Sequence, residues 1–161
     1  MRIGWKTSAT VVAAFALGAI GGVTVAKTAK PEYSLVPAGT AKFGPIDPKN
    51  ASGPQASPLS GDLKTGPVAF FLKLPKGGVP PHWHSSDYYA VSVEGTTKHW
   101  LVGKEADAKP NPPGTFWFQP GGNAATTHGD ECISDSCTVF IFMPGKLDFT
   151  MADAKAAPAK K

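Results

Sequence analysis

The stretch PPHWHSSDYYAVSVEG, residues 80–95, carries the strongest indication of fold and function in this chain of 161 residues. It places His82 and His84 one residue apart, before a run of aromatic and β-branched residues that ends at Glu94 and Gly95. On a β-strand, side chains two residues apart point to the same face and lie about 7 Å apart along the chain. The spacing therefore predicts two imidazoles that share one metal ion.

The same stretch predicts a β-hairpin. We expect Glu94 and Gly95 to form a two-residue turn, so that Ala90 opposes His99 and Tyr88 opposes Leu101. Directly opposed residues share a face of the sheet. This face would carry Tyr88, Ala90, Ser92, Thr97, His99 and Leu101, together with His82 and His84. Three of the four histidines would then converge.

The rest of the chain favours a single all-β domain. Its 18 glycines and 16 prolines favour turns and extended segments over long helices. Short runs rich in β-branched and aromatic residues predict strands within 68–75, 88–95, 96–103, 114–122 and 137–145. The Pro/Gly/Ser-rich segment 36–67 is expected to be a linker, or else irregular edge structure that wraps the barrel through Phe43, Ile46 and Leu59.

The N-terminus predicts export. Arg2 and Lys6 precede a long uncharged run, and the small residues Thr24 and Ala26 close it, as a signal peptidase requires. We expect residues 1–26 to be a secretory signal peptide and 27–34 a tether, in a periplasmic or secreted bacterial protein. An uncleaved membrane anchor is the alternative. At the other end, residues 151–161 are expected to form a disordered tail.

Charge excludes some partners. The formal net charge is +4, and removal of Arg2 and Lys6 would leave +2. Arg2 is the only arginine, so the mature domain would have no guanidinium to bind phosphate in a bidentate manner. We therefore expect no nucleic-acid partner and no stable membrane insertion after signal cleavage.

Cys132 and Cys137, the only cysteines, are separated by four residues with the composition of a turn. In an oxidising compartment this spacing predicts a disulfide across a hairpin. Closing so short a loop contributes about 2 kcal/mol. The alternative, a pair of thiolate metal ligands, lacks the usual two-residue spacing.

Two segments resemble the motifs of the cupin superfamily. GGVPPHWHSSDYYAVSVEG, residues 77–95, is similar to the first motif, G-x5-H-x-H-x3,4-E-x6-G, and GTFWFQPGGNAATTH, residues 114–128, is similar to the second, G-x5-P-x-G-x2-H-x3-N. The resemblance covers about residues 35–150. It is closest to small single-domain bacterial cupins of unassigned activity, and more distantly to the cupin part of zinc-binding anti-sigma factors.

This resemblance implies a jelly-roll β-barrel with a metal ion in its mouth, held by the two histidines and the glutamate of motif one and the histidine of motif two. His82 and His84 match in spacing. The glutamate position, however, is Tyr88. The second-motif histidine position is Ala125, so His128, three residues later, is the candidate. Cys132 stands at the asparagine position counted from His128.

Three residues are candidates to complete the site. Tyr88 would bind as a phenolate or donate a hydrogen bond to water or substrate. Asp87 would supply a substitute carboxylate or be a solvated loop acid, and His99 would be a fourth ligand. The expected cofactor is one divalent transition metal ion, and Zn, Fe, Mn, Cu and Ni all suit imidazole ligands.

Two function classes follow. One is a metalloenzyme, with dioxygenase-type or other metal-dependent chemistry on a small organic molecule in an apolar barrel. Candidates to line that barrel, or simply to pack its core, are Phe70, Phe116, Trp117, Phe118, Phe140 and Phe142. The other is a non-catalytic periplasmic protein that binds or senses a metal or ligand. A degenerate cupin without metal is a third reading, and a homodimer is expected only because exposed barrel edges commonly pair.

Overall fold

The structure, a computed structural model, describes residues 33–152. The predicted signal peptide, most of the predicted tether and the predicted tail from residue 153 onward lie outside the described residues. Eight strands and three short 3-10 helices make up the described part. The strands are β1 (Gly44–Pro45), β2 (Gln55–Gly61), β3 (Val68–Trp83), β4 (Tyr88–Glu94), β5 (Thr97–Leu101), β6 (Phe116–Gln119), β7 (His128–Met143) and β8 (Thr150–Met151), and the helices are η1 (Ala38–Thr40), η2 (Glu105–Asp107) and η3 (Ala124–Thr126). Within residues 33–152, none of the helices has the length and apolar character that a membrane span requires.

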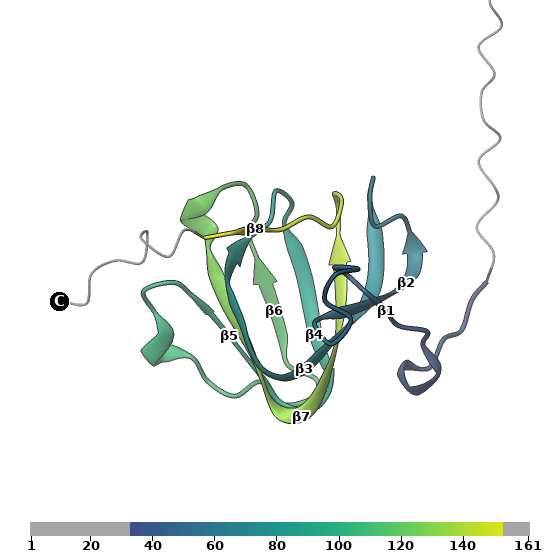
Figure 1. Cartoon of the computed structure of the whole chain (residues 1–161), viewed down its shortest axis with the longest axis horizontal. Helices are drawn as coiled ribbons and strands as arrows, with labels where there is room; N and C mark the ends of the chain where they lie inside the picture. Colours follow the sequence, from purple (N-terminus) through teal and green to yellow (C-terminus); the bar gives the residue numbers. More distant parts are fainter. Residues whose placement is uncertain (1–32, 153–161) are drawn as a thin grey trace, which may run out of the picture. The chain divides into compact units, whose positions relative to one another are not determined.

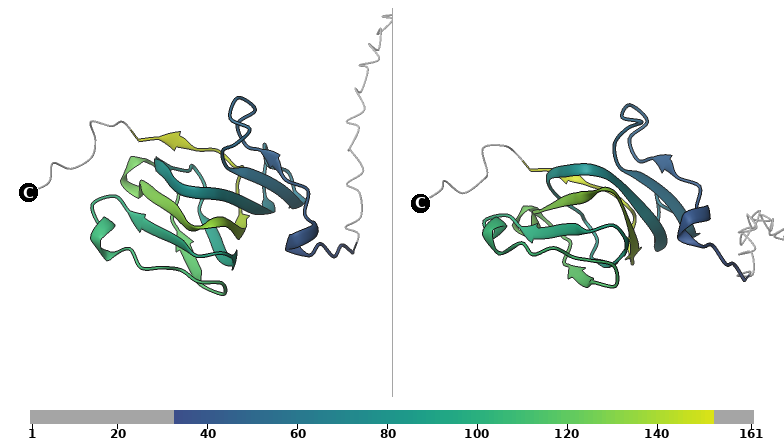
Figure 2. Two further views of the ribbon diagram at one scale, coloured as in Figure 1. Left: turned by 60° about the horizontal axis from the view of Figure 1, so that its bottom comes forward. Right: turned by 90° about the horizontal axis from the view of Figure 1, so that it is seen from below.

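The strands form one antiparallel sheet around the long pair β3 and β7, each of 16 residues. The order is β1-β2-β3-β7-β4-β6, with β5 also on β7 and β8 also on β3. Both long strands bend sharply at the bottom of Figure 1, and the views in Figure 2 show the sheet curled over itself. The prediction of a single all-β barrel domain is confirmed, and each predicted strand segment contains a strand.

The predicted hairpin between β4 and β5 is wrong. Within the described residues these strands share no pairs. Ala90 pairs with Ile141 and Trp117, whereas His99 pairs with Asp130. The reason is that β7 is long enough to bind β4 along one half and β5 along the other. The chain steps between the two halves at Gly95, whose positive φ of 72° and close approach to the Ser136 carbonyl leave no room for a Cβ atom.

The predicted inward face is nevertheless largely correct. Tyr88, Ala90, Ser92 and Thr97 are buried, and the His99 ring lies 6.2 Å from that of Tyr88. Leu101 is the exception, because it is 39% exposed. β4 and β5 pair with the two halves of β7, and both halves face the same interior. The residues expected on one face therefore point inward although β4 and β5 do not pair with each other.

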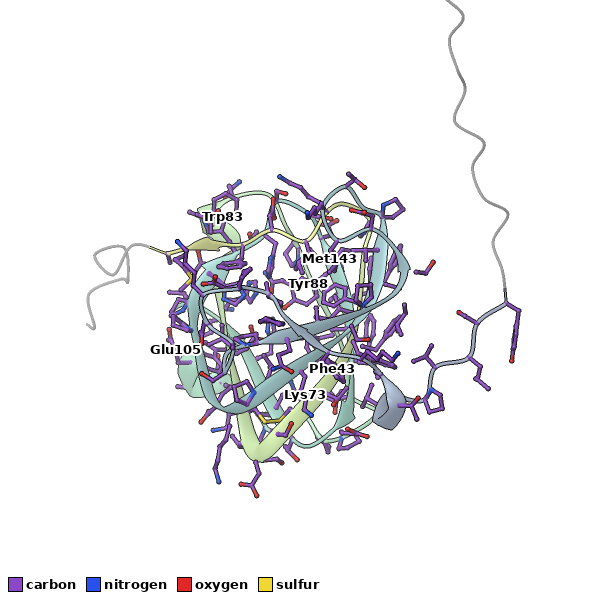
Figure 3. The ribbon with its side chains drawn as sticks, turned by 45° about the vertical axis from the view of Figure 1, so that its right-hand side comes forward. Phe43, Lys73, Trp83, Tyr88, Glu105 and Met143 are labelled. Carbon is purple, nitrogen blue, oxygen red and sulfur yellow. A yellow bond between two sulfur atoms is a disulfide. The ribbon has the colours of Figure 1, made fainter. Side chains whose placement is uncertain are left out.

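The segment 36–67 wraps the barrel. β1 pairs with β2, β2 pairs with β3, and Ile46 packs against the core. Composition hid β2, because Pro58 and small polar residues have low strand propensity. A register shift between Pro58 and Ser60 accommodates the proline, as is usual for proline in a strand. The Lys73 ammonium group lies over the ring of Phe43, and its Nζ is 5.4 Å from the ring centroid (Figure 3).

The predicted disulfide between Cys132 and Cys137 is present, but it does not clip a hairpin. Both cysteines belong to β7. The ladder runs from Pro75 opposite Ser136 to Gly77 opposite Cys132, so three residues of β7 stand against one residue of β3. The disulfide therefore closes a bulge within one continuous strand, at the bend.

Two features extend or define the barrel. Met151 belongs to the segment predicted as a tail. In the structure it is part of β8 and pairs with His82 of β3, so the sheet continues past residue 150. The core consists of inward-facing side chains from β2, β3, β4 and β7. Its buried members are Ala56, Val68, Phe70, Tyr88, Ala90, Val139, Ile141 and Met143.

Candidate metal centre

Three of the predicted ligands lie together at one end of the barrel. His82 is on β3, His84 follows the end of that strand, and His128 begins β7 directly opposite His82 in the ladder. The ring centroids are 4.4 Å apart for His82 and His128, 5.0 Å for His82 and His84, and 5.2 Å for His84 and His128. We call these three residues the histidine cluster. Ligand atoms of all three lie within 4.8 Å of one another.

Backbone carbonyls set the tautomer of each ring in the histidine cluster. Nδ1 of His82 donates to the Pro80 carbonyl at 2.9 Å, Nδ1 of His128 donates to the Thr126 carbonyl at 3.2 Å, and Nδ1 of His84 donates to the Asp148 carbonyl. A carbonyl oxygen only accepts, so each proton sits on Nδ1 and each Nε2 keeps its lone pair. Metal-ligating histidines are oriented in this way.

Burial disfavours the charged imidazolium form of two rings in the cluster. It lowers the pKa of His128 to about 3, against the opposing effect of the Asp130 carboxylate. Burial also lowers the pKa of His84, against the hydrogen bond to the Asp148 carbonyl. Both imidazoles are therefore neutral at neutral pH, the form that binds a metal ion.

The sequence interpretation missed Asp130, which places a carboxylate beside two of the three imidazoles. It follows His128 by two residues on β7 and points to the same side. Its Oδ2 lies 3.8 Å from Nε2 of His82 and 3.9 Å from Nε2 of His128. Burial raises the pKa of Asp130, but the hydrogen bond from His99 leads the effects that outweigh it, and the net shift is downward.

A signal for Asp130 is present in the sequence. The H-x-D spacing of residues 128–130 is the same two-residue repeat that identifies His82 and His84. The run of apolar residues, however, predicts a strand only from Cys137 onward, so the sequence assigns no strand to residues 128–136.

His99 contacts the carboxylate of Asp130. Its Nδ1 is 2.8 Å from Oδ1 of Asp130, and its Nε2 is 3.0 Å from Oε1 of Gln119. The amide of Gln119 is fixed in this orientation because its nitrogen donates to the carbonyls of Pro120 and Thr126. Ligand atoms of His99, His128 and Asp130 also lie within 4.8 Å of one another. Both ring nitrogens of His99 face acceptors, however, which argues against its predicted role as a fourth ligand.

Tyr88 occupies the glutamate position of the first motif and points into the site. Its Oη lies 3.4 Å from Nε2 of His128, and Nε1 of Trp117 donates to it at 3.5 Å. Burial, aided by the Asp130 charge, raises the pKa of Tyr88 well above its ordinary value. The side chain is therefore a neutral phenol, which favours the hydrogen-bonding role over the phenolate.

Asp87, the other candidate from the first motif, is exposed. Its carboxylate accepts a hydrogen bond from the backbone N–H of Gly121 at 2.7 Å. This bond joins the loop before β4 to the loop after β6, which favours the solvated loop acid among the two predicted roles.

A cavity of about 410 Å³ adjoins the cluster inside the barrel. His82, His84, Tyr88, Trp117 and Asp130 line it, and most of the remaining wall is aliphatic or aromatic. Figure 3 shows two of the lining residues, Tyr88 and Met143, within the barrel. None of the described residues that line the cavity is Lys or Arg. The volume and the apolar wall are typical of a site for a small organic molecule.

Of the six aromatic residues predicted to line the interior, only Phe70 and Trp117 line the cavity. The prediction is wrong for the other four because their strand parity turns them to the outer face of the sheet. These four are Phe116, Phe118, Phe140 and Phe142.

The C-terminal segment, residues 144–152, covers part of the cavity and fixes His84. Leu147, Phe149 and Met151 line the cavity at alternate positions. Between them, the Asp148 carbonyl accepts from His84, and the Asp148 carboxylate accepts from the backbone N–H and the hydroxyl of Ser85 at 2.9 and 2.6 Å. One segment therefore both closes the cavity wall and orients a candidate ligand.

Comparisons with known proteins bear on the fold. No protein-family model matches the sequence, and no curated protein matches it. Among solved structures, the polyketide cyclase RemF from Streptomyces resistomycificus is similar at 18% identity with a TM-score of 0.57, over 79% of this chain and 90% of that one. KdgF from Halomonas sp. has 21% identity and a TM-score of 0.51, over 70% of this chain and 96% of that one. An RmlC-like cupin from Shewanella frigidimarina has 18% identity and a TM-score of 0.51, over 71% and 93%.

Acid should destabilise the metal-free protein. In the unfolded chain His84 and His128 titrate near pH 6.5, whereas burial lowers both pKa values in the folded protein, to about 3 for His128. Between these values the unfolded chain binds more protons. The free energy of unfolding should therefore fall as the pH drops below about 6.5, by up to about 1.4 kcal/mol per pH unit from His128 down to about pH 3, with a further loss of the same sign from His84. Urea unfolding in the presence of a chelator, at neutral pH and at moderately acidic pH, measures this.

The variant His128→Gln provides the control. It removes one of the two titrating groups, so the same drop in pH should cost less of its free energy of unfolding. An equal loss in the wild type and in this variant would contradict the assignment of the pH dependence to His128.

Proposed function

Because the chain has the cupin fold, we propose that it is a metalloprotein with one divalent transition metal ion beside a cavity for a small, uncharged organic molecule. The ligands in this proposal are Nε2 of His82, His84 and His128 and Oδ2 of Asp130. One observation carries it: the three imidazoles of the histidine cluster direct Nδ1 to backbone carbonyls, their ligand atoms lie within 4.8 Å of one another, and the Asp130 carboxylate lies 3.8 and 3.9 Å from Nε2 of His82 and His128.

The donor set fits a metal ion in its chemistry. Three neutral imidazoles and one carboxylate suit Zn, Fe, Mn, Cu or Ni. The carboxylate comes from β7 at Asp130 instead of from the position that Tyr88 occupies on β4. In this proposal Asp130 takes the place of the motif-one glutamate, which this chain lacks.

The placement of the donors favours an enzyme. His82, His84 and Asp130 line the cavity, so a small molecule within it would contact the metal side of the site. A divalent ion bound here would supply a Lewis acid that polarises an oxygen of that molecule. Tyr88 would donate a hydrogen bond from Oη to the same oxygen, with Trp117 holding the phenol in place. The apolar wall and residues 144–152 would exclude water. RemF, described as a polyketide cyclase, shows that this fold carries enzymes acting on organic molecules.

A non-catalytic binding or sensing protein is the second candidate, and the same donor count favours it. Three histidines and Asp130 make four protein ligands, which is the closed set of a structural zinc site. Oxygen consumption with phenolic or diketone substrates would support the enzyme, since a closed site would give none.

We also propose that the protein is exported. The disulfide between Cys132 and Cys137 supports this, because disulfides persist in oxidising compartments such as the periplasm. The leader in the sequence, residues 1–26, supplies the export signal in this proposal.

Signal cleavage should leave Lys27 as the first residue of the exported protein. N-terminal sequencing and intact mass of protein from the periplasmic fraction test this. A membrane-bound chain that begins at Met1 would instead support the uncleaved anchor.

Metal binding should depend on the cluster and on Asp130. Elemental analysis of the purified wild type should give about one transition metal ion per chain. His84→Ala should lose it, because a ligand is removed, and Asp130→Asn should bind it more weakly in competition with a chelating dye. His99→Gln is the matched control. It should keep the stoichiometry and lose about 10- to 100-fold in affinity, as for a residue that orients a ligand.

Two results would contradict this assignment. Complete loss of metal in His99→Gln, with the fold intact, would make His99 a ligand. A fully folded wild type that binds none of Zn, Fe, Mn, Cu or Ni would leave the degenerate, metal-free cupin.

The cavity should prefer neutral ligands. In chelator-treated protein, 1-naphthol should bind at least about tenfold more tightly than 1-naphthoate, since burying an unpaired carboxylate among apolar groups is costly. Isothermal titration calorimetry measures both. Leu72→Phe, which fills the cavity wall, should weaken naphthol binding, whereas Leu101→Phe outside the cavity should not. Equal affinity for the two ligands would show that the cavity does not select against charge.

A further inference from the structure

A second, smaller cavity adjoins the one beside the histidine cluster. Its volume is about 180 Å³, and its walls are residues 75–80 of β3 and part of the segment between β1 and β2. Most of its wall residues are exposed, so we call it the outer cavity and the larger one the inner cavity. Four residues line both cavities, and these are Asn50, Pro54, Val79 and Pro80. A single layer of residues therefore separates the two cavities.

The outer cavity lies at a gap in the sheet. β2 pairs with β3 as far as Lys73, and β8 pairs with β3 at His82 and Trp83. His82 also pairs with His128 of β7, so β8 lies on the edge of β3 that faces away from β7, as β2 does. Within residues 33–152, residues 74–80 have no neighbouring strand on this edge. The outer cavity is thus bordered by an unpaired strand edge.

Backbone groups supply much of the polar surface of the outer cavity. A strand edge without a neighbour presents N–H and C=O groups that no ladder satisfies. Gly77 and Gly78 have no side chain to cover these groups, and both residues are exposed. Pro75 and Pro80 stand at the two ends of this stretch and have no N–H to donate. The edge therefore suits a short chain of amide groups better than a long peptide.

Asn50 adds a side-chain donor where the two cavities meet. Its Oδ1 accepts from Oγ of Ser52 at 3.3 Å, so Nδ2 is the atom that can donate to a ligand. Among the described residues of the outer wall, Lys76 alone is charged. Its Nζ lies 3.1 Å from Oδ1 of Asp135, which offsets the charge. The outer cavity therefore favours a neutral hydrogen-bonding group over an anion.

The inner cavity has the opposite character away from the histidine cluster and Asp130. Aliphatic and aromatic side chains such as Phe70, Leu72 and Ile141 form most of its wall. Such a wall favours an apolar group, because a polar group buried there would lose its hydrogen bonds to water. A molecule that occupies both cavities must therefore combine an apolar body with a neutral polar tail.

We propose that the ligand of this site is an amphipathic amide, with an aromatic or aliphatic body in the inner cavity and a short amide tail in the outer cavity. A carbonyl of the tail accepts from Nδ2 of Asn50, and the tail bonds to the edge of β3 at residues 76–79 as an added strand does. This inference rests on the proposed function, because the body occupies the cavity assigned there to a small organic molecule.

Two probes test the inference on the chelator-treated, full-length chain by isothermal titration calorimetry. N-(6-hydroxy-2-naphthoyl)glycinamide carries an amide tail on a naphthol body, and 2-naphthol is the body alone. The tailed probe should bind at least about tenfold more tightly, because its amide groups form hydrogen bonds in the outer cavity. Equal affinity would overturn this inference alone, since the body would still bind. Failure of both probes to bind would overturn the role proposed for the inner cavity as well.

Gly78→Leu should abolish the advantage of the tailed probe and leave the affinity for 2-naphthol unchanged, because a leucine side chain fills the outer cavity. The backbone at Gly78 has no positive φ, and an added Cβ atom would lie 3.7 Å from the Asp130 carbonyl oxygen, an ordinary contact. Gly44→Leu is the matched control. Gly44 is an exposed strand glycine outside both cavities, and an added Cβ atom would meet nothing within 4 Å. This variant should bind both probes as the wild type does.

Asn50→Leu tests the side-chain donor without filling the outer cavity. It should weaken binding of the tailed probe about three- to tenfold and change the affinity for 2-naphthol by less than about twofold, because it removes one hydrogen bond at similar volume. An unchanged affinity for the tailed probe in this variant would overturn the role of Asn50.

Hydrogen exchange of the wild type locates the tail without any substitution. Backbone amides within residues 76–79 should gain protection when the tailed probe binds and should not when 2-naphthol binds. A tailed probe that binds tightly and protects none of these amides would overturn the contact with the edge of β3.

Discussion

The pairing of β3 with β7 is the constraint on which the rest of the structure depends. These two strands hold the ladder from Val68 opposite Met143 to His82 opposite His128. Every other strand except β1 and β6 attaches directly to one of them. The ladder brings together histidines 46 positions apart in the sequence, because the last residues of β3 meet the first residues of β7. The bulge that the disulfide closes lies where both strands bend, and this bend curls the sheet into a barrel.

The backbone also determines the chemistry of the site. Three carbonyl groups, from Pro80, Thr126 and Asp148, each take one imidazole proton. Two of these carbonyls lie two residues before the histidine they orient, whereas the third comes from the C-terminal segment. The tautomers of His82 and His128 are thus set by local chain geometry, while that of His84 depends on long-range closure of the barrel. A side chain performs the same task for the carboxylate, since His99 holds Oδ1 of Asp130 and leaves Oδ2 toward the cluster.

The sequence predicted the positions of most strands, but it did not predict which strands pair with each other. Strand positions followed from apolar periodicity, and the interior parity of Tyr88 and His99 followed from alternation, which is a property of each strand alone. The pairing of His99 with Asp130, 31 positions away, did not follow, because a two-residue turn signal at Glu94 and Gly95 suggests a hairpin with equal force. β2 escaped detection for a related reason: Pro58 lowers its intrinsic propensity, and only its place beside β3 makes it a strand.

Alternation along β7 places two sets of side chains on opposite faces of the sheet, although the sequence interpretation expected the apolar members of both inside the barrel. His128, Asp130, Val139, Ile141 and Met143 face the interior, where they form the cluster, the cavity wall and the core. The phenylalanines of the same strand, expected inside on composition alone, occupy the intervening positions and face outward. Since side chains on opposite faces of a strand do not touch, substitutions on the outer face leave the donor set in place, and inner-face substitutions can remove a donor without altering the outer surface. A composition rich in aromatic residues is therefore evidence for two apolar surfaces here, and only strand parity assigns each ring to one of them.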